Sequence, residues 1–243
     1  IVPIAEPDEI LEQPTFKDGH IRLMLLDPPI IRTDPSAASG PAWQAFTARL
    51  QQRQCRTVRF TDEQRPSAHN CDMLVNDHPD ADTDANVAAY RSENPTMDLC
   101  AGLRYFMIDR EHETITPAPH NSVFISFGGG DQSGLVEHFR HAIDRIADLA
   151  PVHLVTGPAT AVAHQDNGNI SVHHNLAPAA FAALLAGAKL AVTAGGNTMF
   201  ERVFHQRPGV SVAQFEHQQS FGLAFEKRNL TKHLGLGTQV TPE

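Results

Sequence analysis

The chain has 243 residues, of which 41% are hydrophobic and 19% charged, a composition typical of a globular protein with one large or two modest domains. Its 28 acidic residues outnumber its 19 lysines and arginines, which gives a net charge of -9 and argues against a nucleic-acid-binding surface. No apolar run approaches the ~20 residues of a membrane span, and the three widely spaced cysteines indicate no disulfide framework.

The first half of the chain has the pattern of parallel strands with one intervening helix. Residues 21–27 form a near-continuous apolar run, which is typical of a strand buried on both faces of a parallel sheet. Helical spacing of apolar residues predicts a helix over 41–54, and short apolar runs predict strands over 57–62 and 72–77. Asp27 ends the first strand, where it either faces a ligand, as in open α/β sheets, or caps the following turn.

Two features that could indicate a metal site do not support one. The acidic segment 80–84 has the spacing of a calcium loop, but Ala85 occupies the position of the sharp glycine turn and Arg91 that of the bidentate glutamate. We therefore interpret this segment as a solvated acidic loop. The adjacent His173 and His174 lie in a predicted strand, so their side chains point to opposite faces and cannot converge on one ion. No metal site is predicted.

Residues 114–121 contain two prolines and little apolar content, which suits an interdomain linker. We therefore expect a partial N-terminal Rossmann-like domain over 1–116 and a C-terminal Rossmann-like domain over 117–243. The predicted strands of the second domain cover 122–127, 152–156, 170–174, 190–193 and 209–213, and its predicted helices cover 135–148, 178–188, 197–205 and 218–228.

Two strand–glycine–helix junctions are the strongest signs of a binding site. Such a junction brings backbone N–H groups and the positive end of a helix dipole to one point, which suits a phosphate. The alternative is a structural turn that uses the backbone freedom of glycine. The candidate phosphate-binding residues are Gly128, Gly129, Gly130, Asp131, Gly195, Gly196, Asn197 and Thr198. Glu201 lies one turn into the second helix, where its carboxylate could reach a sugar hydroxyl.

Five motifs occur in a fixed order between about residues 21 and 234. They are Phe60-Thr-Asp62 through Cys71-Asp72-Met-Leu-Val-Asn76, Cys100-Ala-Gly102-Leu-Arg-Tyr105 leading to Arg110-Glu111, Phe124-Ile-Ser-Phe-Gly-Gly-Gly-Asp131, Ala194-Gly-Gly-Asn-Thr-Met-Phe-Glu-Arg202, and Pro208 with His217-Gln218. Together they resemble the nucleotide-sugar hydrolase of the pseudaminic acid pathway and its spore-coat polysaccharide relatives.

The resemblance implies a two-domain GT-B fold, which this family shares with the glycosyltransferase that forms lipid II. It implies a cytoplasmic enzyme of nonulosonic acid or surface polysaccharide biosynthesis that uses no cofactor and binds a UDP-linked deoxy amino sugar. In that family, water displaces UDP from the anomeric carbon with inversion. The glycine turns contact the diphosphate, Glu201 holds the ribose hydroxyls through charge-assisted hydrogen bonds, and Gln218 lies near the sugar.

The chain departs from this family where the chemistry is done. The family's catalytic histidine belongs to a Gly-x-Gly-His-x-x-Arg turn after the first strand, whereas a strand follows His20 here, so we assign no catalytic base. Pro28 or Pro29 stands where an aromatic residue is usual, and Asp109 replaces a usual arginine. We therefore expect a chain that lacks the first strands of its domain. The leading hypothesis is a nucleotide-sugar hydrolase; the alternatives are a glycosyltransferase of the same fold and a non-catalytic nucleotide-sugar-binding remnant.

Overall fold

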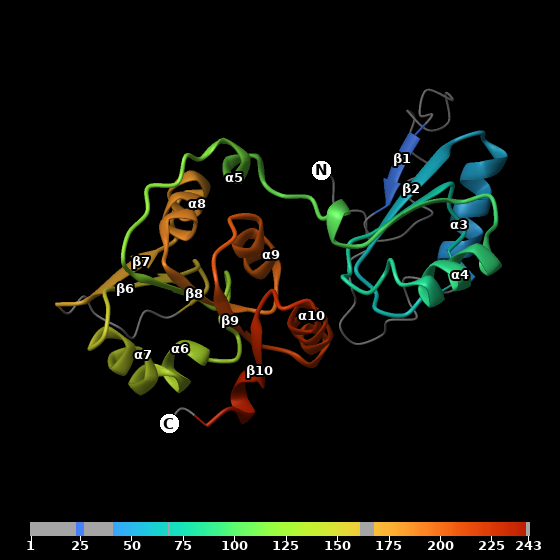
Figure 1. Ribbon diagram of the computed structural model, residues 1–243. Helices are drawn as coiled ribbons and strands as arrows, with labels where there is room; N and C mark the ends of the chain where they lie inside the picture. The colour runs from blue at the N-terminus through green and yellow to red at the C-terminus, as the bar shows by residue number, and fades with distance from the viewer. Residues whose placement is uncertain (1–22, 27–40, 68, 161–167, 242–243) are drawn as a thin grey trace. The chain divides into compact units, whose positions relative to one another are not determined.

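The computed structural model of the chain describes residues 23–26, 41–67, 69–160 and 168–241 (Figure 1). Within these ranges the chain forms two compact units, the first ending at Phe106 and the second beginning at Met107. Each unit is built on a sheet in which all strands run parallel. Every helix among the described residues is too short or too polar to cross a lipid bilayer.

The first unit contains a four-stranded sheet in the order β1-β2-β3-β4. Its elements are β1 (Leu23–Leu26), α3 (Pro41–Gln52), β2 (Arg56–Thr61), β3 (Met73–Asn76), α4 (Asp84–Glu93) and β4 (Asp98–Ala101). The first three strands and α3 lie where the sequence predicted them. However, Leu23 and Leu25 of β1 are 57% and 63% exposed, so the expectation that this strand is buried on both faces was wrong. The fourth strand was not predicted, because its four residues Asp-Leu-Cys-Ala carry no strand periodicity of their own. Pairing with β3, from Met73 opposite Asp98 onward, holds it in the sheet.

The predicted acidic loop 80–84 is a turn with Asp82 and Asp84 exposed, and a helix that the sequence did not predict, α4, begins at its last residue. The hydroxyl of Thr83 accepts a hydrogen bond from the backbone N–H of Asn86 at 3.4 Å and caps α4. Asp84 supplies a negative charge in the first turn, where the helix dipole favours it. Tyr90 anchors the helix by packing with Leu74 in the core of this unit. Capping and burial therefore outweigh the polar composition of the segment.

The second unit contains a six-stranded sheet in the order β10-β9-β8-β5-β6-β7. Its strands are β5 (Val123–Ser126), β6 (Val152–Thr156), β7 (Ile170–His174), β8 (Leu190–Ala194), β9 (Gly209–Ala213) and β10 (Lys232–Leu236). Its helices are α5 (Arg110–Thr114), α6 (Leu135–His138), α7 (Arg140–Ala147), α8 (Pro178–Gly187), α9 (Asn197–Phe204) and α10 (Glu216–Lys227).

The strand order of this sheet places a ligand-binding position at its centre. The chain moves from β5 outward to β6 and β7, returns through α8 to β8 beside β5, and then moves outward the other way to β9 and β10. Figure 1 shows α6 and α7 on one side of the sheet and α8 and α9 on the other. The direction of winding reverses between β5 and β8, and open α/β sheets bind ligands beyond the carboxyl ends of the strands at such a point.

The central strand β5 is buried on both faces, which explains its continuous apolar sequence. Phe124 packs on one face against Leu185 of α8, and Ile125 packs on the other against Ile143 of α7. Each of these side chains is at most 1% exposed. Burial of a side chain of this size stabilises a fold by about 1.5–3 kcal/mol, so the two layers fix the position of the turn that follows β5.

The second unit differs from the sequence prediction in three places. The predicted helix 135–148 is interrupted at Phe139 and forms α6 and α7. The edge strand β10 was not predicted, because Gly235, with a φ of 97°, interrupts its pattern and shifts its register against β9. The predicted linker 114–121 packs on α8: α5 contacts that helix, and the backbone N–H of His120 donates to a carbonyl of α8 at 2.9 Å. The second unit therefore begins before the expected boundary at 116/117.

Candidate functional site

A cavity of about 230 Å³ lies at the carboxyl ends of the central strands of the second unit. Its walls come from the turns after β5, β6 and β7 and from α8 and α9. Its lining includes Gly128, Gly129, Gly157, Leu176, Phe181 and Glu201. The cavity therefore occupies the position that the winding of the sheet marks for a ligand.

The turn between β5 and α6 presents backbone to this cavity. Gly128 has a φ of 92°, a left-handed conformation that favours glycine. A Cβ on Gly129 would meet no atom within 4 Å, so there is free space where a side chain at this position would point. The side-chain amide of Gln214, from the segment after β9, donates to the carbonyl of Phe127 and so anchors the start of the turn. The turn is thus fixed at its base and open toward the cavity.

Asp131, predicted as a phosphate-site residue, has a local structural partner. Its two carboxylate oxygens accept hydrogen bonds from the backbone N–H groups of Leu135 at 2.7 Å and Val136 at 3.0 Å. These are the unpaired donors at the start of α6, so the side chain caps that helix. Neither Asp131 nor Gly130 lines the cavity.

The turn between β8 and α9 lies beside Gln218 of α10. A Cβ on Gly195 would lie 3.0 Å from the Cβ of Gln218, and the side-chain oxygen of Gln218 accepts a hydrogen bond from the backbone N–H of Gln214 at 2.8 Å. The structure therefore brings together Gly195, Gly196 and Gln218, as the sequence predicted, although none of the three lines the cavity. Asn197 begins α9 and is exposed.

Glu201 places a carboxyl group in the cavity wall. Its side chain is 17% exposed, and burial raises its pKa to about 7, with a further contribution from the negative charge of Asp109. A hydrogen bond with the Thr198 side chain acts in the opposite direction and lowers the pKa. Thr198 lines the cavity as well. Near neutral pH both the protonated and the ionised form of this carboxyl group are therefore populated, and hydroxyl donors from a ligand would favour the ionised form.

Two buried histidines that the sequence analysis did not identify lie next to Glu201, outside the cavity lining. His112 Nε2 is 3.6 Å from Glu201 Oε1, and His112 Nδ1 is 2.9 Å from His205 Nε2. Burial lowers the pKa of His112, and burial together with the positive charges of protonated His112 and Arg207 lowers that of His205 to about 4. Both imidazoles are therefore neutral at neutral pH.

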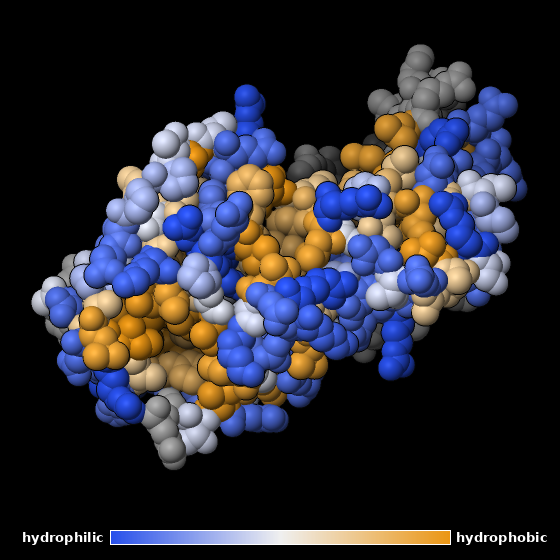
Figure 2. Space-filling view, viewed as in Figure 1, coloured by the Kyte–Doolittle hydropathy of each residue, from blue (hydrophilic) through white to orange (hydrophobic). Residues whose placement is uncertain are grey.

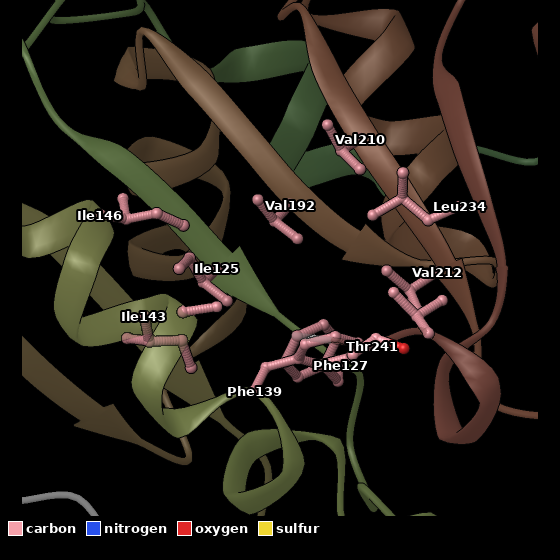
Figure 3. A pocket seen from close by; sticks show the side chains of 12 residues that line it. Ile125, Phe127, Phe139, Ile143, Ile146, Val192, Val210, Val212, Leu234 and Thr241 are labelled. Atoms are coloured by element: carbon pink, nitrogen blue, oxygen red, sulfur yellow. The ribbon is translucent and has the colours of Figure 1, made fainter. Parts of the chain in front are cut away.

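A second cavity, of about 240 Å³, lies against the face of the sheet that carries α7. Figure 3 shows aliphatic side chains from β5, β8, β9 and β10 and from α7 pointing into it. The space-filling view shows hydrophobic side chains gathered on this part of the second unit (Figure 2). Thr241 brings the one side-chain hydroxyl among its lining residues. Because it has no other polar side chain to bind a charged ligand, the cavity that contains Glu201 is the better candidate for a site that binds a polar ligand.

The sequence therefore identified part of this cavity. Four predicted residues line it: Gly128, Gly129, Thr198 and Glu201. Asp27 and His20 lie outside the described residues. The sequence prediction missed Gly157 after β6 and Leu176 after β7, although the rule that ligands bind beyond the carboxyl ends of strands could have pointed to both.

The described residues contain no group of three His, Cys, Asp or Glu side chains that could hold a metal ion. His173 and His174 face opposite sides of β7, as predicted. His173 Nε2 lies 3.0 Å from His153 Nδ1, whereas His174 Nδ1 lies 3.2 Å from the hydroxyl of Thr156.

No protein-family model and no curated protein matches the chain. Several solved structures do. They include MurG from Acinetobacter baumannii (TM-score 0.52, 13% identity, 84% of this chain and 59% of that one) and the spinosyn rhamnosyltransferase SpnG in complex with thymidine diphosphate (0.55, 11%, 94% and 63%). A third is the UDP-GlcNAc 2-epimerase from Methanocaldococcus jannaschii (0.54, 9%, 98% and 73%).

At these identities the likeness shows the fold alone. It confirms the predicted fold class: an α/β protein with a GT-B-like combination of two Rossmann-like units. The chain spans less than two thirds of the length of the two glycosyltransferases.

Proposed function

We propose that the second unit binds the nucleotide part of a UDP-sugar in the cavity that contains Glu201, and that the chain is an enzyme acting on the bond between UDP and the sugar. The observation that carries this proposal is the position of Glu201. A half-buried carboxyl group and an open glycine turn share one cavity at the point where the winding of the sheet reverses. These are the groups that a ribose diol and a diphosphate require.

Each part of a nucleotide has a suitable wall in this cavity. The backbone N–H groups of the turn at Gly128 and Gly129 suit the diphosphate, and the N-terminus of α9 adds its positive dipole. The ribose hydroxyls donate to Glu201. Phe181 and Leu176 are apolar residues of the lining, against which the flat face of a base can pack.

Within this proposal, hydrolysis is the leading reaction. Water attacks the anomeric carbon of a UDP-linked deoxy amino sugar, the bond from that carbon to the diphosphate oxygen breaks, and UDP leaves. This choice, like the expected cytoplasmic location and role in nonulosonic acid or surface polysaccharide synthesis, rests on the five sequence motifs. The base that activates the water is not assigned to any residue of the cavity.

Sugar transfer is the second candidate, and the fold of MurG and SpnG supports it equally. An acceptor hydroxyl would then replace water in the same attack. Pro28 and Pro29, which stand where the family usually has an aromatic residue, favour a third possibility: a module that binds a nucleotide-sugar without turning it over.

Calorimetric titration of the chain with UDP, followed by incubation with UDP-GlcNAc as a probe, distinguishes these three candidate functions. UDP release without an acceptor supports hydrolysis, and release that depends on an added sugar acceptor supports transfer. UDP binding without release at any enzyme concentration supports the binding module. A chain that binds neither UDP nor UDP-GlcNAc would refute the proposal.

A further inference from the structure

We propose that His112 is a positioning residue for Glu201: hydrogen-bonded to His205 and in polar contact with Glu201, it completes a chain of contacts that selects the ionised form of the carboxylate and orients it toward the nucleotide. This inference rests on the proposed binding of ribose at Glu201. It adds two residues to the site that lie outside the cavity lining and outside the five sequence motifs.

Two separate segments supply the residues of this chain of contacts. His205 caps the C-terminus of α9 four residues after Glu201, and its backbone N–H donates to the carbonyl of Glu201 at 3.1 Å. His112 enters from α5, on the segment that packs against α8. Its ring contacts the edge of Phe181, a residue of the cavity lining, at 6.4 Å between ring centroids and 80° between planes. His112 is thus held between the cavity wall and α9.

The distances restrict the protons that the imidazoles can carry. One ring nitrogen of each neutral histidine donates and the other accepts. If His112 carries its proton on Nε2, it presents an N–H to Glu201 and accepts at Nδ1 from His205 Nε2, 2.9 Å away. If it carries the proton on Nδ1, the lone pair of Nε2 faces Glu201. A carboxylate is repelled by this lone pair, whereas a protonated carboxyl group can donate a hydrogen bond to it. The tautomer of His112 and the charge of Glu201 are therefore coupled.

The groups around this chain favour neutral imidazoles. Burial lowers the pKa of both rings, and Arg207, whose side chain donates to the carbonyl of His205 at 2.8 Å, adds a positive charge beside His205. The negative charge of Asp109, at the start of α5, disfavours ionisation of Glu201 and raises the pKa of His112, but burial has the larger effect on that ring and lowers its pKa. Glu201 therefore meets a neutral N–H donor in His112, together with the side chain of Thr198. At 3.6 Å the His112 contact is longer than a hydrogen bond, and we expect it to shorten when Glu201 is ionised.

The consequence is a pH-dependent site. The ribose hydroxyls donate to an ionised Glu201, so affinity for UDP falls as pH drops below the pKa of that carboxyl group, by about tenfold per pH unit. An N–H from His112 stabilises the ionised form and lowers this pKa. Removal of the N–H should therefore move the midpoint of the affinity curve to higher pH.

The test compares His112→Phe, which fills the space without a donor, with His112→Gln, which retains an N–H at a similar distance from the backbone. UDP affinity is measured by calorimetry between about pH 5.5 and 8.5. We expect H112F to bind UDP roughly tenfold more weakly at neutral pH with its midpoint shifted upward, and H112Q to keep the wild-type midpoint. Glu201→Gln should remove the pH dependence. An unshifted midpoint in H112F would overturn the inference, because lost packing alone would weaken binding equally at every pH.

A second measurement needs no nucleotide. Long-range 1H–15N correlation spectra at about pH 8 should show His112 and His205 both protonated at Nε2, and 13C titration should give Glu201 a higher pKa in H112F than in the wild type. A His112 protonated at Nδ1 at this pH, or an unchanged pKa of Glu201, would refute the chain. Should H112F not fold, His205→Phe breaks the chain at its other end. If the wild type binds no UDP while these NMR results hold, the proposed function fails and the coupling stands.

Discussion

The α-carbon of Gly157 lies directly against the backbone of Gly129. A Cβ at Gly157 would be 2.2 Å from the carbonyl oxygen of Gly129 and 2.3 Å from its α-carbon. This contact joins the turn after β6 to the turn after β5, and both residues line the candidate nucleotide cavity. The close approach of the two turns requires a residue without a side chain at position 157.

Gly157→Ala should therefore displace the glycine turn. We expect the free energy of unfolding to fall by about 1–3 kcal/mol, as for other overpacked positions, and UDP affinity to fall by roughly tenfold or more. Gly129→Ala is the matched control, because a Cβ there meets nothing within 4 Å. Urea denaturation of both variants measures the difference. Equal stability of G157A and the wild type would show that the two turns are not in contact.

Asp131→Ala should act on stability and leave nucleotide binding unchanged. Loss of the two hydrogen bonds to Leu135 and Val136 uncaps α6, which we expect to cost about 1–2 kcal/mol in the free energy of unfolding. Asp131→Asn keeps one acceptor and should lose less. Calorimetry should find UDP affinity within about threefold of the wild type in both. A large loss of UDP affinity at unchanged stability would mean that Asp131 contacts the ligand, as its motif predicted.

Glu201→Gln should stabilise the protein at alkaline pH. The pKa of Glu201 is about 7 in the folded chain against 4.5 as its ordinary value, so between these values the unfolded chain has lost a proton that the folded chain retains. Stability contributed by this group therefore falls as pH rises through this window, by on the order of 3 kcal/mol in total. A glutamine at position 201 does not ionise, so the variant does not lose this stability as pH rises.

We accordingly expect E201Q to be more stable than the wild type at about pH 8 and equally stable near pH 4.5. The low pKa values of His112 and His205 reduce stability at acidic pH, but they do so in both proteins and cancel in the comparison. Urea midpoints at several pH values measure the difference. A gain in stability that is the same at every pH would mean that Glu201 titrates normally in the folded chain.

Local sequence predicted the parts of the fold whose cause is local. The strands 152–156 and 209–213 lie at the predicted residues, because their apolar runs are long enough to identify a strand without its neighbours. Glu201 was identifiable because a glycine turn precedes it. Strand β4 and the close contact at Gly157 depend on pairing with distant segments and carry little local signal. His112 and His205, 93 residues apart, meet only through the packing of α5 on α8.

Calorimetric titration with UDP of the wild type and of Glu201→Ala tests the central claim most directly, with pyrophosphate as a ligand that lacks the ribose. We expect the wild type to bind UDP at neutral pH and E201A to bind it more weakly by ~1–3 kcal/mol, the usual loss for a charged hydrogen-bond partner. Pyrophosphate affinity should be equal in the two proteins, since the glycine turn is unchanged. Absence of UDP binding by the wild type, or equal UDP affinity of the two proteins, would contradict a ribose site at Glu201.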